Sequence, residues 1–277
     1  MMNKRINIMY FSATDTTKKV VYGIAEKLSE DFKIKEKINS IDFTLPKVRE
    51  KVMAFSKEDI VVVGLPVYAG RVPNVLLKYL KTIIGNDALA IAVVVYGNRN
   101  YDDALIELKD ILELDGFKVV AGAAFIGEHS FSNTLAQNRP DEKDMDVVKA
   151  FSDEISDEIY EKIINEKLIK TVSVKGNTPY RKYYMPKDEK GQPIDIRKVK
   201  PKTNNNCINC KLCVKLCPMG SIEFENVTKL NEICIKCGAC IKKCPVEAKY
   251  FDDIGYLKHK EELENNFKYR REPELFV

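Results

Sequence analysis

The eight cysteines of the chain are the residues best suited to metal chemistry. All of them lie between Cys207 and Cys244, and the 206 residues before them contain none. They form two runs of the same spacing, Cys-x2-Cys-x2-Cys-x3-Cys-Pro, which end at Pro218 and Pro245. Thiolates at this spacing bind cubane [4Fe-4S] clusters. The sequence therefore predicts two such clusters.

The fourth cysteine of each run is predicted to bind the cluster of the other run. Three thiolates at two-residue gaps can surround one cubane from a single loop, but the chain then turns away into a short helix. Zinc and disulfides are the alternatives. Zinc sites often include histidine, whereas His129 and His259 lie outside both runs, and no export signal favours disulfides. We assign Cys207, Cys210, Cys213 and Cys244 to cluster 1, and Cys217, Cys234, Cys237 and Cys240 to cluster 2.

A hydroxyl-rich loop follows the first predicted strand and precedes a predicted helix. Free amides and the helix dipole at a helix N-terminus attract phosphate, and Ser and Thr add hydroxyl donors. Hydroxyl residues at this position also simply cap helices, which is the alternative. The candidate phosphate residues are Ser12, Ala13, Thr14, Asp15, Thr16 and Thr17.

Two further loops follow the third and fourth predicted strands. In an open α/β sheet the carboxyl ends of the strands form the edge where ligands bind. Tyr68 and Tyr101 could each present a ring face to a flat heterocycle there. The alternative is that these loops are structural turns whose tyrosines pack in the core. The candidate residues are Pro66, Val67, Tyr68, Ala69 and Gly70 in one loop, and Tyr96, Gly97, Asn98, Arg99, Tyr101 and Asp102 in the other.

A fourth loop, 127–132, follows the fifth predicted strand and contains His129. A lone loop histidine is more often structural or solvated than catalytic. Proton delivery to the bound heterocycle is the functional alternative for His129.

Five short apolar runs alternate with helical patterns over the first 168 residues, which predicts an α/β fold with a doubly wound, five-stranded parallel sheet. The runs Ile60–Gly64 and Leu89–Tyr96 are nearly continuous in apolar residues, as in strands buried on both faces. The predicted strands are Arg5–Phe11, Phe32–Ile38, Ile60–Pro66, Leu89–Tyr96 and Phe117–Phe125. The predicted helices are Thr16–Ser29, Pro73–Ile84, Asp102–Asp115 and Asp141–Leu168.

Composition and charge bear on the partners and the cellular compartment of the protein. The net charge of +4 does not indicate nucleic-acid binding, and no window of the sequence is long and apolar enough to span a membrane. We expect a cytoplasmic protein. Nothing in the sequence fixes the oligomeric state, and a homodimer remains open.

The chain is predicted to have four parts. Between the α/β part and the cysteines lies a basic segment rich in Pro and Tyr. This connector is either a solvated linker, or it packs Tyr180, Tyr183, Tyr184 and Met185 on a neighbouring domain while its cations face anionic cofactors. The predicted parts are 1–169, the α/β domain; 170–203, the connector; 204–252, a small α+β cluster domain; and 253–277, a helical docking tail.

The two cysteine runs resemble the bacterial two-cluster ferredoxins, and the first half of the chain resembles the flavodoxins over about 160 residues. The second resemblance implies that the heterocycle is FMN. This chain departs from the flavodoxin phosphate loop, because Ala13 and Asp15 occupy its glycine positions. We expect Asp15 to point outward, since a carboxylate near phosphate is repulsive.

As a whole, the sequence resembles flavodoxin–ferredoxin fusion proteins of anaerobic metabolism. That resemblance implies an electron-transfer oxidoreductase with two [4Fe-4S] clusters and FMN in one chain. Three functions remain open: an electron carrier that serves a redox partner protein, an FMN-dependent reductase of a small molecule such as a quinone, nitro compound or flavin, and a zinc-bearing interaction module. A flavin covered by the chain favours the carrier, and an open pocket beside it favours the reductase.

Overall fold

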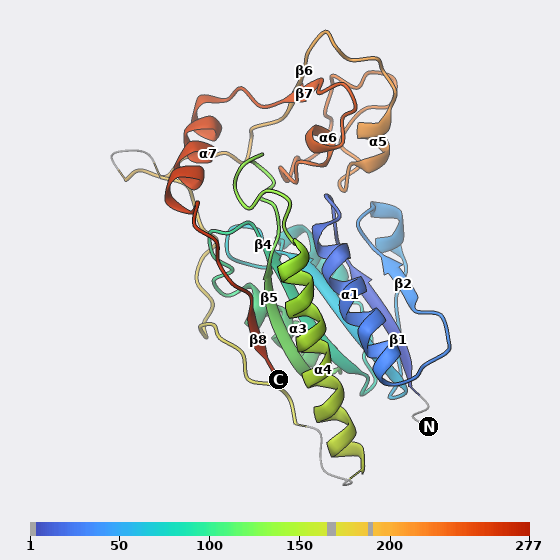
Figure 1. Ribbon diagram of the computed structural model, residues 1–277. Coiled ribbons are helices and arrows are strands. Elements are labelled where there is room, and N and C mark those ends of the chain that lie inside the picture. Colours follow the sequence, from blue (N-terminus) through green and yellow to red (C-terminus); the bar gives the residue numbers. More distant parts are fainter. Residues whose placement is uncertain (1–3, 165–169, 188–190) are drawn as a thin grey trace.

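The computed structural model describes residues 4–164, 170–187 and 191–277, and its largest element is a six-stranded sheet (Figure 1). The strand order is β2-β1-β3-β4-β5-β8, in which the first five strands are parallel. The order 2-1-3-4-5 is that of flavodoxin-like sheets, so the predicted fold class is confirmed. The strands are β1 (Arg5–Tyr10), β2 (Asn39–Asp42), β3 (Asp59–Pro66), β4 (Leu89–Tyr96), β5 (Lys118–Ile126) and β8 (Glu274–Phe276).

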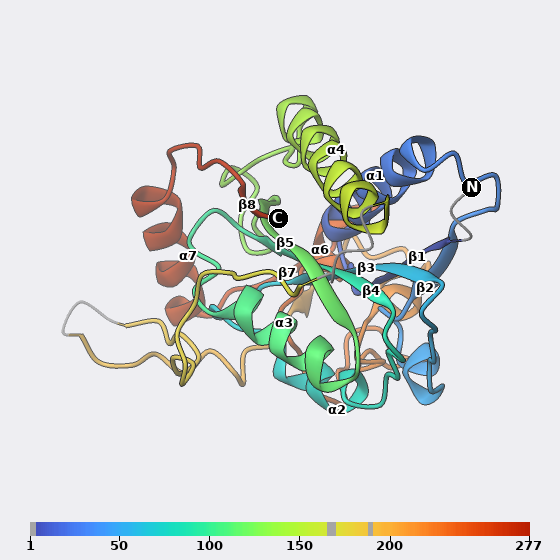
Figure 2. The same ribbon diagram turned by 90° about the horizontal axis from the view of Figure 1, so that it is seen from below.

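Helices cover both faces of this sheet (Figure 2). The helices α1 (Thr16–Asp31) and α4 (Glu142–Ile164) lie on one face, and α2 (Leu77–Leu80) and α3 (Ala104–Leu114) lie on the other. Every residue of β4 is buried, because apolar side chains from both helical layers pack against it. Two short 3-10 helices, η1 (Pro46–Glu50) and η2 (Asn74–Leu76), complete this part of the chain.

The cysteine-rich region lies beyond the carboxyl ends of the parallel strands (Figure 1). Its regular elements are short because two cysteine loops occupy most of the sequence. The two loops are built alike: Lys211 and Gly238 both take left-handed backbone angles, with φ of 63° and 78°, and each precedes a one-turn helix. The elements are β6 (Lys202–Thr203), α5 (Leu212–Leu216), α6 (Ala239–Lys242) and β7 (Lys249–Tyr250), and β6 pairs with β7 in antiparallel register.

The C-terminal tail returns to the sheet. Helix α7 (Ile254–Asn266) is capped at its N-terminus by Asp253, whose side chain accepts a hydrogen bond from the Tyr256 amide at 2.9 Å. The chain then adds β8 antiparallel to β5, a sixth strand that the sequence did not predict. A strand of three residues is too short to show a recognisable hydrophobic pattern. It forms because the edge of β5 is available for pairing.

Two predicted elements differ from the structure. The second strand was predicted at Phe32–Ile38, but α1 ends there, Lys33 takes a left-handed φ of 52°, and the strand follows at β2. Most side chains of β2 are exposed, so no apolar run marks it. The predicted helix Pro73–Ile84 is reduced to η2 and α2. The end of the predicted fourth helix lies outside the described residues.

The connector packs on the α/β part through its tyrosines. The guanidinium carbon of Arg71 lies 4.7 Å from the ring centre of Tyr180 and 5.1 Å from that of Tyr183. The Tyr184 ring lies 4.3 Å from the guanidinium carbon of Arg99. Tyr180 and Tyr183 are half-buried, whereas Tyr184 and Met185 are exposed, so the packed interpretation holds for Tyr180 and Tyr183, in part for Tyr184, and not for Met185.

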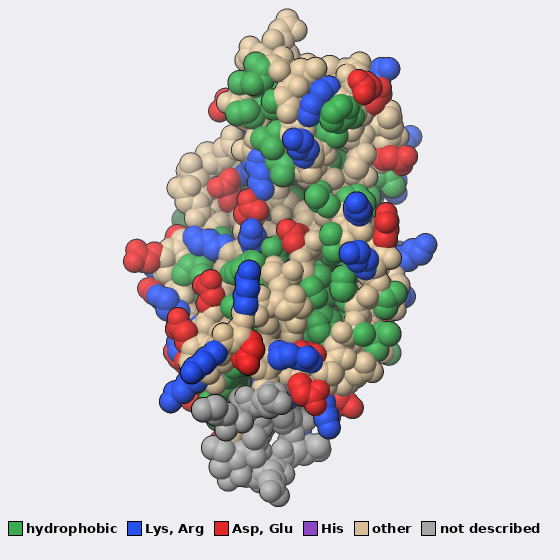
Figure 3. All heavy atoms as spheres, turned by 90° about the vertical axis from the view of Figure 1, so that its right-hand side faces the viewer, with side chains coloured by type: hydrophobic (Ala, Val, Ile, Leu, Met, Phe, Trp, Pro, Cys, Tyr) green, Lys and Arg blue, Asp and Glu red, His purple; other side chains and the backbone are tan. Residues whose placement is uncertain are grey.

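Cationic and anionic side chains are interspersed over the face shown in Figure 3. Among the described residues, no helix has the length and apolar character needed to cross a bilayer.

Candidate functional site

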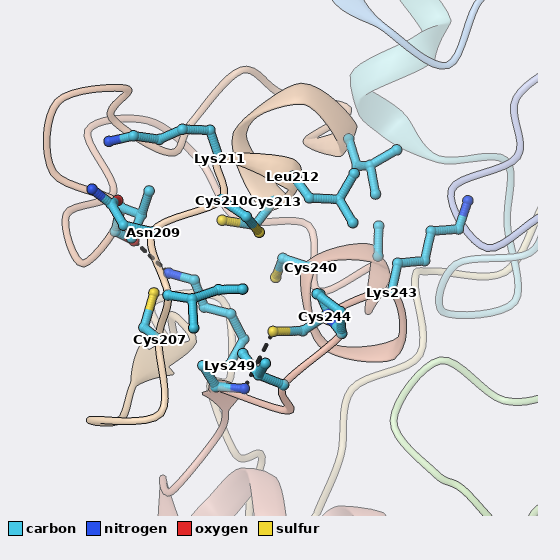
Figure 4. A pocket seen from close by; sticks show the side chains of 17 residues that line it. Cys207, Asn209, Cys210, Lys211, Leu212, Cys213, Cys240, Lys243, Cys244 and Lys249 are labelled. Atoms are coloured by element: carbon cyan, nitrogen blue, oxygen red, sulfur yellow. Dashed lines mark hydrogen bonds between the residues drawn. The ribbon is translucent and has the colours of Figure 1, made fainter.

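The cysteine sulfurs surround two adjoining cavities. The first, cluster cavity 1, is lined by the first three cysteines of the first run and by Cys244, the last cysteine of the second (Figure 4). The second, cluster cavity 2, is lined by Cys217 together with the first three cysteines of the second run. Cys240 lines both cavities. The cavities thus bring together the cysteines that the spacing assigns to each cluster, and which sulfurs bind which cluster stays a prediction.

Local backbone structure explains why the fourth cysteine of each run lies at the cavity of the other run. Cys217 is the extended residue at which α5 ends, Cys244 directly follows the end of α6 at Lys243, and a downstream amide binds each sulfur. The Ser221 amide donates to Cys217 Sγ at 3.3 Å, and the Ala248 amide donates to Cys244 Sγ at 3.2 Å. Such amide–sulfur hydrogen bonds orient metal ligands and stabilise their negative charge.

The chemistry of the cavities fits anionic iron–sulfur clusters. Burial raises the pKa of the Cys237 thiol to about 12 and raises that of Cys240 further, so coordination to iron is what would hold these sulfurs as thiolates. The Lys249 side chain lines cluster cavity 1 and is almost fully buried. A buried ammonium is costly unless an anion compensates it.

A third cavity, here called the loop cavity, lies at the carboxyl ends of the parallel strands. It contains nine of the predicted phosphate and heterocycle residues: Ala13, Thr14, Thr16, Thr17, Pro66, Val67, Tyr68, Tyr96 and Gly97. Six further residues line it: Val95, Gly127, Glu128, His129, Ser130 and Cys237. Four of these six belong to loop 127–132, whose position after the fifth strand could have predicted that they line the cavity. No sequence signal indicated Cys237, because its contribution depends on how the two halves of the chain pack.

Two predicted phosphate-loop residues do not line the loop cavity. Ser12 Oγ accepts a hydrogen bond from the Lys18 amide at 3.0 Å. Asp15 takes the left-handed φ of 66° and forms an ion pair with Lys243 at 2.7 Å. The Asp15 side chain is 61% exposed, so it points outward as expected.

Fewer residues of the two heterocycle loops line the loop cavity than predicted. Ala69 and Gly70 do not line the loop cavity; the Ala69 carbonyl accepts a hydrogen bond from the Tyr184 amide at 2.8 Å. Tyr101 is buried against Tyr96 and donates to Glu274 of β8 at 3.0 Å. The C-terminal tail and the connector occupy this side of the sheet edge, which is why these residues face them. Asn98 donates to the carbonyls of Phe267 and Tyr269, Arg99 pairs with Asp102, and none of the three lines the cavity.

Comparison with known families supports the assignment of the second half of the chain. Residues 163–259 match the family model of the 4Fe-4S dicluster domain. The chain joins a flavodoxin-like domain to a 4Fe-4S dicluster domain. No curated protein matches it significantly.

Solved flavodoxins are similar to the flavodoxin-like domain. A flavodoxin from the domain Archaea has 14% sequence identity and a TM-score of 0.39, with 56% of this chain and 99% of that chain covered. A short-chain flavodoxin associated with a bacterial microcompartment has 15% identity and a TM-score of 0.40, with 56% and 97% covered. A Fusobacterium nucleatum flavodoxin bound to flavin mononucleotide has 19% identity and a TM-score of 0.35, with 57% and 98% covered.

The dicluster domain closes over the loop cavity of the flavodoxin-like domain. A Cβ atom on Gly238 would lie only 2.7 Å from the Ser130 carbonyl oxygen, so a larger residue would separate the domains. Lys242 donates to the Ser132 carbonyl at 2.7 Å and pairs with Glu128. These contacts hold Cys237 at the cavity wall.

His129 is an uncharged hydrogen-bonding group at this cavity. Its Nδ1 accepts a hydrogen bond from the Phe131 amide at 3.1 Å, which leaves Nε2 to carry the proton. Burial, reinforced by the charges of His259, Lys242 and Arg99, lowers the pKa of His129 to about 3. At neutral pH the imidazole therefore can donate a hydrogen bond but has no second proton to deliver.

Proposed function

We propose that this chain is an electron-transfer flavo-iron–sulfur protein. Two [4Fe-4S] clusters occupy the cluster cavities, with the ligands grouped as predicted, and FMN occupies the loop cavity. The clusters pass single electrons, while FMN accepts one or two, so the chain connects one-electron and two-electron chemistry. It exchanges electrons with a redox partner. The cytoplasm, where thiols stay reduced, is the expected compartment.

One observation carries the proposal: Cys237, a cluster 2 ligand in the predicted grouping, also lines the loop cavity. Tyr68 shares that wall. Burial raises the pKa of Tyr68 well above its ordinary value, and the nearby sulfurs of Cys237 and Cys234 add to the effect. A flavin ring against Tyr68 would lie next to cluster 2, which is the arrangement that transfer within one chain requires.

The loop cavity fits FMN in its chemistry. In flavodoxin-like sheets FMN lies at the switch point between β1 and β3. Thr14, Thr16 and Thr17 line the cavity at the N-terminus of α1, where free amides and hydroxyls can bind a phosphate. Asp15 points away and is neutralised by Lys243. The Nε2–H of His129 can orient the polar edge of the ring.

The covered position of the loop cavity favours an electron carrier over a small-molecule reductase. Cys237 and Ser130 come from opposite domains and both line the cavity. Ion pairs from Lys242 and Lys243 hold the domains together there. A substrate that must reach the flavin ring would have to displace this contact, whereas an electron can enter through the dicluster domain.

The test begins with the cofactors of anaerobically purified protein. We expect iron and acid-labile sulfide for two [4Fe-4S] clusters and one FMN per chain. A low-potential one-electron reductant should then reduce all centres, and the reduced protein should pass electrons to a one-electron protein acceptor. Sustained turnover of quinone, nitro compound or free flavin would support the reductase instead. Absence of acid-labile sulfide, or of FMN, would refute the proposal.

A further inference from the structure

Lys249 is a buried cation at the wall of cluster cavity 1. It lies in β7, its side chain is 3% exposed, and Figure 4 shows it beside Cys207 and Cys244. Lysine is almost never this buried unless it is paired. Its position one residue after Ala248, whose amide binds Cys244 Sγ, fixes it relative to the sulfurs.

The hydrogen-bond partners of Lys249 are both neutral. Its Nζ donates to Thr203 Oγ1 at 2.7 Å and to the Val227 carbonyl. In the part of the chain that the structure describes, none of the ion pairs includes Lys249. The thiolate sulfurs around the cavity are therefore the anionic groups available to balance its charge.

The two other lysines that line cluster cavity 1 are arranged differently. Lys211 donates to the Phe224 carbonyl at the surface, and Lys243 pairs with the Asp15 carboxylate. Solvent screens the first charge and a carboxylate neutralises the second. Lys249 is buried, and no carboxylate among the described residues pairs with it.

We propose that Lys249 raises the reduction potential of cluster 1, an inference that rests on the proposed function. One-electron reduction adds a single negative charge to the cavity, and the electron comes from an external reductant. A fixed positive charge stabilises that added charge. Because Lys249 is buried, the interaction is strong and salt screens it little. Lys249 thus acts through its charge on the reduced form of cluster 1.

The test compares Lys249→Gln with Lys211→Gln in full-length, cluster-loaded protein. Glutamine keeps a hydrogen-bond donor for Thr203 and Val227 but removes the charge. The potentials of both clusters are measured by mediated dithionite titration followed by electron paramagnetic resonance. We expect K249Q to lower the reduced-to-oxidised ratio of one cluster about tenfold at fixed potential, which is ~59 mV for a one-electron couple. The other cluster should shift less, and the difference should persist at high salt. K211Q should cause a small shift that high salt removes.

Equal shifts of both clusters, or no shift, in K249Q would overturn the inference. Thr203→Asp supplies an independent measurement, because it keeps Lys249 but places a carboxylate beside its Nζ; the same cluster should shift in the same direction. Loss of clusters in both variants would assign Lys249 a purely structural role and would also overturn it. Failure of the wild-type protein to show two reducible clusters would refute the proposed function itself, before any variant is compared.

Discussion

Replacing Asp103 with alanine should loosen the connector around Asn177 and Arg181 where it lies on the flavodoxin-like domain. Asp103 is fully buried at the start of α3. Its carboxylate accepts hydrogen bonds from the Asn177 amide at 3.0 Å, from Asn177 Nδ2 at 2.9 Å and from the Arg181 amide at 2.6 Å. One side chain therefore binds two positions of the connector, beside the contacts that its tyrosines make.

The expected loss is large because the acceptor is charged and buried. Each hydrogen bond to a charged group contributes about 1.5–3 kcal/mol, and the three are not additive. Losing the three together is therefore expected to cost about 3 kcal/mol. Asp103→Ala leaves two backbone amides without an acceptor, so we expect local opening to become more favourable by roughly that amount. This corresponds to amide exchange faster by about a hundredfold or more.

The assay is hydrogen–deuterium exchange of the segment around Asn177 and Arg181, with cofactors retained. Asp103→Asn keeps the shape and should accelerate exchange less than Asp103→Ala. Asp146→Ala, at an exposed position of α4 that pairs with Lys149, is the matched control and should change nothing. Less than tenfold acceleration in Asp103→Ala would refute the reasoning.

The pH dependence gives a second check on Asp103. Burial raises the pKa of Asp103, but hydrogen bonds from the Arg181 amide and from Asn177 lower it by more, so the pKa in the folded protein lies below its ordinary value. Its stabilisation is therefore fully present above the ordinary aspartate pKa of about 4 and is lost as pH falls through the lower folded value. Exchange corrected for its intrinsic rate should show this loss in wild type and not in Asp103→Asn.

Three further outcomes are expected. Cys217→Ala and Cys244→Ala should each damage both clusters, because each removes a sulfur that links the two runs; iron analysis showing a full complement in either variant would contradict the crossed grouping. Lys243→Gln should weaken FMN binding about fivefold, because Asp15 is no longer neutralised near the phosphate, and should weaken riboflavin binding less, since only the loosened domain contact affects it; titration of flavin fluorescence measures both, and equal weakening would contradict the role of charge. The pKa of His129 is lowered to about 3, so as pH falls below about 6.5 the unfolded state takes up a proton that the folded state does not. The stability of the folded protein should therefore decrease as pH falls from about 6.5 towards 3, and thermal unfolding of His129→Gln should lack this contribution.

The sequence alone predicted the fold class, which the strand order confirms, and a pair of [4Fe-4S] clusters, which the match to the dicluster domain supports. Regular spacing places three sulfurs of each run in one loop, and the two repeats have the same left-handed backbone at corresponding positions, at Lys211 and Gly238. The continuous apolar runs of β3 and β4 likewise predicted central strands, because burial on both faces leaves a pattern within the strand itself. Features that depend on neighbouring residues along the chain could be predicted.

Only the tertiary structure decided which loop residues face the loop cavity. Tyr101 was a reasonable partner for a flat ring, but Glu274 of β8 binds its hydroxyl. Cys237 enters the same cavity because Gly238 allows close contact with Ser130, some 100 residues earlier in the chain. Such contacts depend on the packing of distant segments, and neither spacing nor hydrophobic pattern records them. The same holds for the burial of Lys249 beside the cysteine sulfurs, which arises only when the chain has folded around it.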